Sequence, residues 1–95
     1  MNMNENTHYT NNHGKQLRDF ILVNDPLQWE HACNWSAIKY YIRAGKKAGE
    51  SKDKDLKKCS DYLSELVMID PIQYDKKAMW EQLSIIKSEF DRWEG

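Results

Sequence analysis

Residues 34–47 combine side chains that bind phosphate at a spacing that brings them together. Lys39 and Arg43 are four residues apart, so they share one face of an expected helix, and Lys46 and Lys47 follow as further cationic donors. Arginine offers a planar fork of N–H donors and lysine a mobile charge, and both suit a phosphate better than an apolar core. The segment therefore indicates an anion site, with a solvated basic surface as the alternative.

Tyr40 is the aromatic residue best placed to join this site. It points about 100° away from Tyr41 on a helix, so the two rings cannot share one face. Tyr41 falls with the apolar residues Ile38 and Ile42, which leaves Tyr40 to stack on a base or to donate its hydroxyl group. The commoner outcome for such a residue is a partly buried ring, and both interpretations stay open.

Two other groups of residues are candidates for the same ligand site. His8 and Tyr9 place two ring side chains in a polar arm, and histidine changes its protonation near neutral pH. Asp55, Lys58 and Tyr62 recur along one face of the next expected helix, where Asp55 and Lys58 are most simply a surface ion pair. If this helix packs antiparallel to the central one, its face borders the basic site.

The charges are unevenly distributed along a chain of 95 residues with a formal net charge of −1. Residues 34–58 carry eight Lys or Arg against three acidic residues, a balance of +5, whereas residues 70–95 carry four basic against six acidic residues, a balance of −2. The two regions can attract each other across subunits. No nucleic-acid reader motif accompanies the basic region, so we expect a small-molecule ligand, with DNA or RNA binding as a third and less favoured alternative.

Several other functions have no supporting motif in the sequence. No apolar segment follows the first residues and none reaches membrane-spanning length, which predicts a cytoplasmic protein with no membrane partner. Cys33 and Cys59 fit buried thiols of a reduced protein, and no paired metal-ligand spacing is present, so we expect no metal site. The segment AGKKAGESK resembles a Walker phosphate loop only superficially, because no strand precedes it.

Helical periodicity predicts an all-α fold of three to five helices that position these side chains. A flexible polar arm is expected over residues 1–13, a helical domain over residues 14–69, and an amphipathic C-terminal helix within residues 70–95. Asp25 can cap a helical turn that has Pro26 at its first position.

The expected helix ends are set by residues with known capping preferences. Asn34 can cap the central helix, whose apolar face includes Trp35, and Gly45 is suited to end it. Ser51 or Asp53 can cap the helix that follows.

The C-terminal helix has apolar residues at alternating spacings of four and three: Met79, Leu83, Ile86, Phe90 and Trp93. This a/d pattern covers about two heptads, too few for an isolated coiled coil, and Trp80 lies off its seam. The seam can pack against the domain or against a neighbouring subunit. Because the chain is small, we expect a homo-oligomer.

These motifs together resemble a small domain family of tailed bacteriophages that has no known function and is commonly labelled phage nucleotide kinase. The resemblance covers about the first two-thirds of the chain. It rests on an HY pair, an N-x-x-x-x-K-Y-x-x-R-A-G-K-K motif and a D-L-K-K-x-x-x-Y-L motif, represented here by His8, Tyr9, Asn34, Lys39, Tyr40, Arg43, Ala44, Gly45, Lys46, Lys47, Asp55, Leu56, Lys57, Lys58, Tyr62 and Leu63.

The resemblance and the residue chemistry both imply a nucleotide or nucleotide-derived phosphate ligand. In a phage protein, this ligand could be a nucleotide or cyclic-nucleotide signal of the host's immune system, which the protein would sequester. The alternative is a nucleoside monophosphate kinase, or a component of one, which would use ATP and magnesium. Gln16 stands where the family has a glutamate, and this departure and the missing Walker loop favour binding over catalysis.

Overall fold

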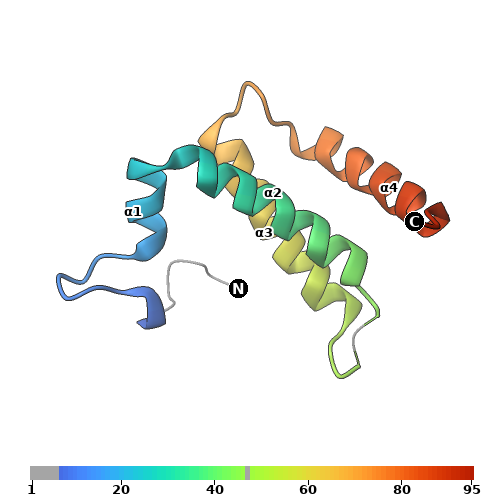
Figure 1. The fold of residues 1–95 in the computed structure, drawn as a ribbon, viewed down its shortest axis with the longest axis horizontal. Helices are drawn as coiled ribbons and strands as arrows, with labels where there is room; N and C mark the ends of the chain where they lie inside the picture. Colours follow the sequence, from blue (N-terminus) through green and yellow to red (C-terminus); the bar gives the residue numbers. More distant parts are fainter. Residues whose placement is uncertain (1–6, 47) are drawn as a thin grey trace.

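A computed structural model describes residues 7–46 and 48–95, and the elements in this part of the chain are helical (Figure 1). The predicted all-α fold is confirmed. Within the described ranges there is no strand, and Thr10 and Gln16 form an isolated bridge. The elements are the 3-10 helix η2 (Thr7–Tyr9) and the α-helices α1 (Leu17–Asn24), α2 (Pro26–Arg43), α3 (Lys52–Ile69) and α4 (Lys76–Arg92).

Helix α2 begins earlier than the sequence motif suggests. The Asp25 side chain accepts a hydrogen bond from the Gln28 backbone N–H, and Pro26 occupies the first helical position, as predicted. The prediction that Asn34 caps the central helix is wrong, because Asn34 lies inside α2. Once a helix has started at an aspartate–proline signal, an interior asparagine costs it less than about 1 kcal/mol, so the helix continues through this position.

A glycine turn reverses the chain after α2. Gly45 has a φ of +81°, a conformation that suits glycine, and the Lys46 backbone N–H donates to the Arg43 carbonyl at 2.8 Å. Helix α3 then begins at Ser51, whose hydroxyl accepts from the Lys54 backbone N–H at 3.1 Å. As a result α2 and α3 form an antiparallel pair that lies side by side along most of its length (Figure 1).

The core lies mainly between α2 and α3. Small side chains let the two helices approach closely, and the buried apolar residues are Cys33, Ala37, Cys59, Leu63, Leu66 and, from α4, Leu83. Both cysteines are free and fully buried, as predicted. Burial raises the pKa of the Cys33 and Cys59 thiols to about 12, so they remain protonated at neutral pH.

Helix α4 packs against this pair mainly through its first half. Leu83 is buried, and Trp80 contacts Tyr41 with the ring centroids 5.9 Å apart. Trp80 was expected to lie off the seam, but it takes part in the contact between α4 and α2. The face of α4 that packs is therefore broader than the a and d positions of the heptad. Phe90 and Trp93 are 49% and 71% exposed, so the second half of the seam stays largely open. The homo-oligomer stays a prediction.

Helix α1 is joined to the helix pair by a polar network. Arg18 Nε donates to Glu65 Oε1 at 2.8 Å, and Trp29 Nε1 donates to the same oxygen at 3.3 Å. The Arg18 guanidinium also lies 5.8 Å from the centroid of the Trp29 ring. None of the helices in the described part combines the length and the apolar composition that a membrane crossing requires.

Candidate functional site

Two tyrosines meet where α2 and α3 run side by side. The rings of Tyr40 and Tyr62 are stacked, with centroids 5.9 Å apart and planes inclined by 8°. The antiparallel arrangement thus brings the face of α3 next to the basic residues of α2, which confirms the predicted proximity. Both rings are partly buried, so the side chains at this junction are held by packing.

Three cationic side chains surround the Tyr40 ring. Lys39 Nζ lies 5.6 Å, Arg43 Cζ 4.6 Å and Lys58 Nζ 5.2 Å from the ring centroid. Each is within the range of a cation–π interaction, and the ring therefore offsets part of the repulsion among the three charges. We call these residues the cationic cluster: Lys39, Tyr40, Arg43, Lys58 and Tyr62.

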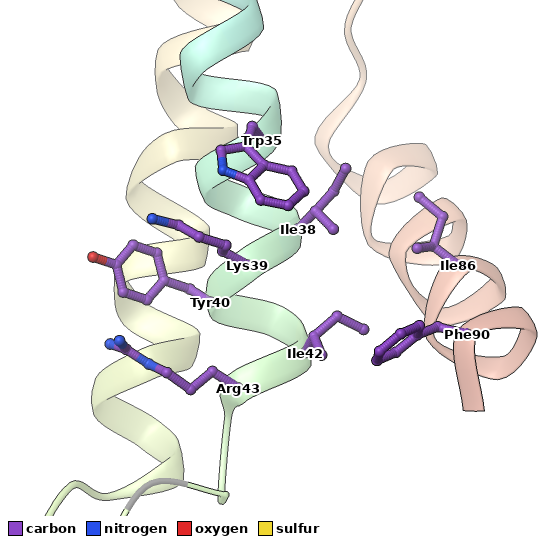
Figure 2. A pocket seen from close by; sticks show the side chains of 8 residues that line it. All are labelled: Trp35, Ile38, Lys39, Tyr40, Ile42, Arg43, Ile86 and Phe90. Atoms are coloured by element: carbon purple, nitrogen blue, oxygen red, sulfur yellow. The ribbon is translucent and has the colours of Figure 1, made fainter. Parts of the chain in front are cut away.

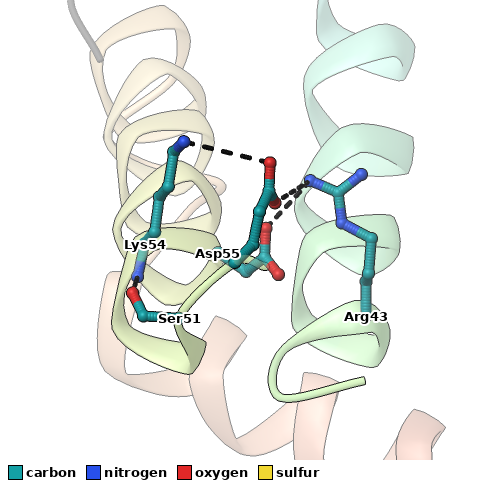
Figure 3. A network of polar contacts seen from close by, with 5 residues as sticks. Arg43, Ser51, Lys54 and Asp55 are labelled. Atoms are coloured by element: carbon teal, nitrogen blue, oxygen red, sulfur yellow. Dashed lines mark hydrogen bonds and ion pairs between the residues drawn. The ribbon is translucent and has the colours of Figure 1, made fainter. Parts of the chain in front are cut away.

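Asp55 holds the arginine of this cluster in place. Arg43 Nη2 donates to Asp55 Oδ1 at 2.8 Å and to Glu50 Oε2 at 3.4 Å (Figure 3). The Asp55 side chain is 0% exposed, so the predicted surface ion pair between Asp55 and Lys58 is wrong. The sequence predicts the spacing of residues within α3 but not the position of α2. Helix α2 buries Asp55 and supplies Arg43 as its ion-pair partner in place of Lys58.

The ion pair shifts the pKa of both partners. The hydrogen bond from Arg43 lowers the pKa of the Asp55 carboxyl group, even though its desolvation acts in the opposite direction. The same hydrogen bond raises the pKa of Arg43. Both groups are therefore charged throughout the neutral pH range.

Two buried atoms of this ion pair lack a hydrogen-bond partner among the described residues: Arg43 Nε and Asp55 Oδ2.

The site keeps a positive charge after its ion pairs are counted. Neither Lys39 nor Lys58 forms an ion pair with a carboxylate in this part of the chain. Four cations, Lys39, Arg43, Lys54 and Lys58, face two carboxylates, Glu50 and Asp55, a local balance of +2. An anion is the ligand that such a balance favours.

We expect the stabilisation from Asp55 to disappear in acid. A carboxyl group whose pKa is lowered on folding stabilises the protein fully above its ordinary value of 3.8, and this stabilisation is lost as the pH falls towards the lower folded value. The melting temperature of Asp55→Asn should therefore lie well below that of the wild type at pH 7, with the gap closing below about pH 4. Thermal unfolding measured from pH 7 to pH 3 tests this. A constant gap would show that the charge of Asp55 does not stabilise the fold.

A groove of about 380 Å³ runs between α2 and α4 beside the cationic cluster (Figure 2). Its lining residues are Trp35, Ile38, Lys39, Tyr40, Ile42, Arg43, Ile86 and Phe90. Trp35 was expected on the apolar face that meets the core, but its side chain is 61% exposed and lies over the groove. The core face of α2 is filled by Cys33 and Ala37, whose small side chains leave no space there for an indole.

The remaining predicted residues are not gathered at this site. His8 and Tyr9 line a separate hollow of about 400 Å³ with Gln16 at the start of α1. Asn34 and Lys46 are exposed, the first in the middle of α2 and the second just after its end. Lys47 and residues 1–6 lie outside the described residues, as does that part of the predicted polar arm.

The sequence analysis did not assign Trp35, Phe90 or Glu50 to the site. Trp35 and Phe90 line the groove, and Glu50 is the second carboxylate at Arg43. The signal available in the sequence was the spacing of four residues between Glu50 and Lys54, which is typical of an ion pair at the start of a helix. In the structure these two charges lie 3.9 Å apart. Among residues 7–46 and 48–95, no group of three His, Cys, Asp or Glu side chains could hold a metal ion.

Comparison with known proteins gives one family and two relatives. Residues 3–64 match the family model DUF3310, described as a protein of unknown function. The chain is similar to the SaV protein of Lactococcus phage p2, at 32% identity over 102 aligned positions that cover 100% of this chain and 78% of the relative. It is also similar to the SaV protein of Lactococcus phage SK1, at 41% identity over 69 positions that cover 70% of this chain and 52% of the relative. No solved structure matches the chain.

Proposed function

We propose that this chain, which belongs to the DUF3310 family of proteins of unknown function, binds a nucleotide or nucleotide-derived phosphate ligand at the cationic cluster. One observation carries the proposal: Lys39, Arg43 and Lys58 all lie within 5.6 Å of the centroid of one tyrosine ring. Three cations converging on so small an area repel each other, and a phosphate group placed among them relieves that repulsion.

The arrangement supports a phosphate group more than a simple ion. Arg43 is held by Asp55 through one guanidinium nitrogen, which fixes the orientation of its planar fork. Lys39 and Lys58 come from different helices and form no ion pair with a carboxylate among the described residues, although the charge of Lys58 also helps to lower the pKa of Asp55. Charge-assisted hydrogen bonds from a fixed arginine and two mobile lysines suit the several oxygens of a phosphate.

We propose that the ligand is retained without being turned over. Phosphoryl transfer needs positions for both a phosphate donor and an acceptor, whereas the described residues gather one cationic cluster. The two relatives named above are phage proteins, and a phage protein that retains a nucleotide can sequester a signal that the host's immune system produces. Self-association of the chain is a further part of this proposal, because exposed apolar residues remain on α4.

Calorimetric titration with ADP, thymidine monophosphate, cyclic AMP and pyrophosphate tests the proposed function. We expect at least one nucleotide to bind, and Lys39→Ala to weaken it about tenfold because one charge-assisted hydrogen bond is lost. Lys77→Ala is the matched control, since Lys77 is an exposed lysine of α4 that does not line the groove. Failure of all four compounds to bind would overturn the proposal, as would equal losses in the two variants.

A kinase assay distinguishes retention from the alternative function. Purified protein is mixed with ATP, magnesium and the four deoxynucleoside monophosphates, and the products are separated by chromatography. We expect no diphosphate to form. A diphosphate product that depends on Arg43 and Lys39 would replace retention by nucleoside monophosphate kinase activity.

A further inference from the structure

The groove between α2 and α4 has two chemically different sides. Ile42 of α2 and Phe90 of α4 point towards each other across it (Figure 2). Lys39 and Arg43 border it on the side that faces α3, beside the Tyr40 ring. The charged ends of these two side chains point towards α3 and away from Phe90, so the cationic cluster lies at one border of the apolar slot (Figure 2).

We propose that this groove holds the base of the bound nucleotide, with Trp35 as its stacking surface, while the cationic cluster holds the phosphate. This inference rests on the proposed function. It adds a binding site for the base, whereas the cationic cluster accounts only for the phosphate. Lys39, Tyr40 and Arg43 belong to both the groove and the cluster, so one small molecule can reach both.

The exposure of the aromatic residues supports a ligand with a flat ring. Trp35 is 61% exposed and Phe90 is 49% exposed, so neither ring is explained by packing of the core. Nucleic-acid bases stack on such side chains, and each stacked base contributes about 1–3 kcal/mol when tested by alanine substitution. Aromatic surface next to arginine and lysine is therefore typical of a nucleotide site.

The size and charge of the groove favour a small molecule over a partner helix. Its volume of about 380 Å³ lies within the range of about 300–1,000 Å³ that is usual for small-molecule sites. The lining is mostly apolar, and Lys39 and Arg43 border it with their charged ends directed towards α3. A ligand with an anionic group at one end and an apolar ring at the other complements this pattern, and a nucleotide has both.

The inference predicts a loss of affinity that affects nucleotides and spares pyrophosphate. In Trp35→Ala, ADP should bind about tenfold more weakly, because the stacking surface is removed. Pyrophosphate should bind as it does to the wild type, because Lys39, Arg43 and Lys58 remain. Titration of the full chain with both compounds measures the ratio of the two affinities. Trp35→Phe keeps an aromatic surface and should recover most of the lost ADP affinity.

Trp93→Ala is the matched control for this experiment. Trp93 is 71% exposed and does not line the groove, so its removal should leave both affinities unchanged. A Trp35→Ala protein with an unchanged ratio of ADP to pyrophosphate affinity would overturn the groove as base site but leave the cluster as phosphate site. Absence of binding of both compounds to the wild type would overturn both. A dimer that Trp35→Ala converts to a monomer, with ADP affinity unchanged, would assign the groove to self-association instead.

Discussion

Replacing Arg43 with alanine should both abolish nucleotide binding and lower the melting temperature by more than about 5 °C. The binding loss follows from the loss of the one planar donor of the cationic cluster, whose guanidinium lies 4.6 Å from the Tyr40 ring centroid. The stability loss follows because Asp55 is 0% exposed and would keep a buried charge without its principal partner. Differential scanning calorimetry and titration with ADP measure the two effects.

A paired substitution separates the two roles of Arg43. Arg43→Met combined with Asp55→Leu removes the charge of both partners and fills the space with apolar atoms, so stability should largely return. Nucleotide affinity should not return, because the donor is still missing. If the paired variant binds ADP as tightly as the wild type, Arg43 acts only in the fold. An unchanged melting temperature in Arg43→Ala would contradict the structural role of the ion pair.

The combined substitution Lys39→Ala and Lys58→Ala should weaken nucleotide binding about 100-fold while changing the melting temperature little. The two lysines are on α2 and α3, and each lies within 5.6 Å of the Tyr40 ring centroid. Neither forms an ion pair with a carboxylate among the described residues, and Asp55 keeps Arg43 as its main partner, so the fold should lose little stability. Titration with ADP at two salt concentrations measures the loss, and the wild type should bind more weakly at the higher concentration.

The control for this double substitution removes the same charge elsewhere. Lys52→Ala combined with Lys77→Ala takes one exposed lysine from the start of α3 and one from α4. It should bind ADP within about twofold of the wild type, because these positions are outside the cationic cluster. Equal losses in the two double variants would show that net charge, and not the cluster, attracts the ligand.

Local sequence signals predicted the helices well. The aspartate–proline signal, the glycine after the end of α2 and the serine cap of α3 each depend on a few neighbouring residues, and each is observed, although Asp25 caps the central helix itself, a role that the sequence had assigned to Asn34. The approach of Asp55 and Tyr62 to the basic helix also followed once an antiparallel pair was assumed. Such features need only the local chain geometry, which the sequence contains.

The features that depend on packing between helices were harder to predict. Trp35 has the spacing of a core residue, but the fully buried positions of α2 are Cys33 and Ala37, and the indole lies outside the core. Asp55 has the appearance of a surface charge in its own helix, and its burial is created by α2. Trp80 packs on Tyr41 although it lies off the heptad seam, so α4 contacts α2 through residues that the heptad pattern does not identify.

The HY motif, His8 and Tyr9, is the part of the sequence signature that does not lie at the cationic cluster. His8 and Tyr9 lie against the start of α1 and line their own hollow with Gln16. Sequence proximity in a motif gives no distance in space, since the chain between Tyr9 and the cationic cluster includes α1 and the first part of α2. Their part in ligand binding remains a prediction.

Mass spectrometry of the small molecules that co-purify from phage-infected cells tests the central claim most directly. The wild type and the Lys39→Ala, Lys58→Ala double variant are purified in parallel, and the compounds released on denaturation are compared. We predict that a nucleotide or nucleotide-derived phosphate compound is enriched with the wild type and depleted with the double variant. Recovery of no phosphorylated compound, or of the same compound in equal amount from both proteins, would contradict a nucleotide site at the cationic cluster.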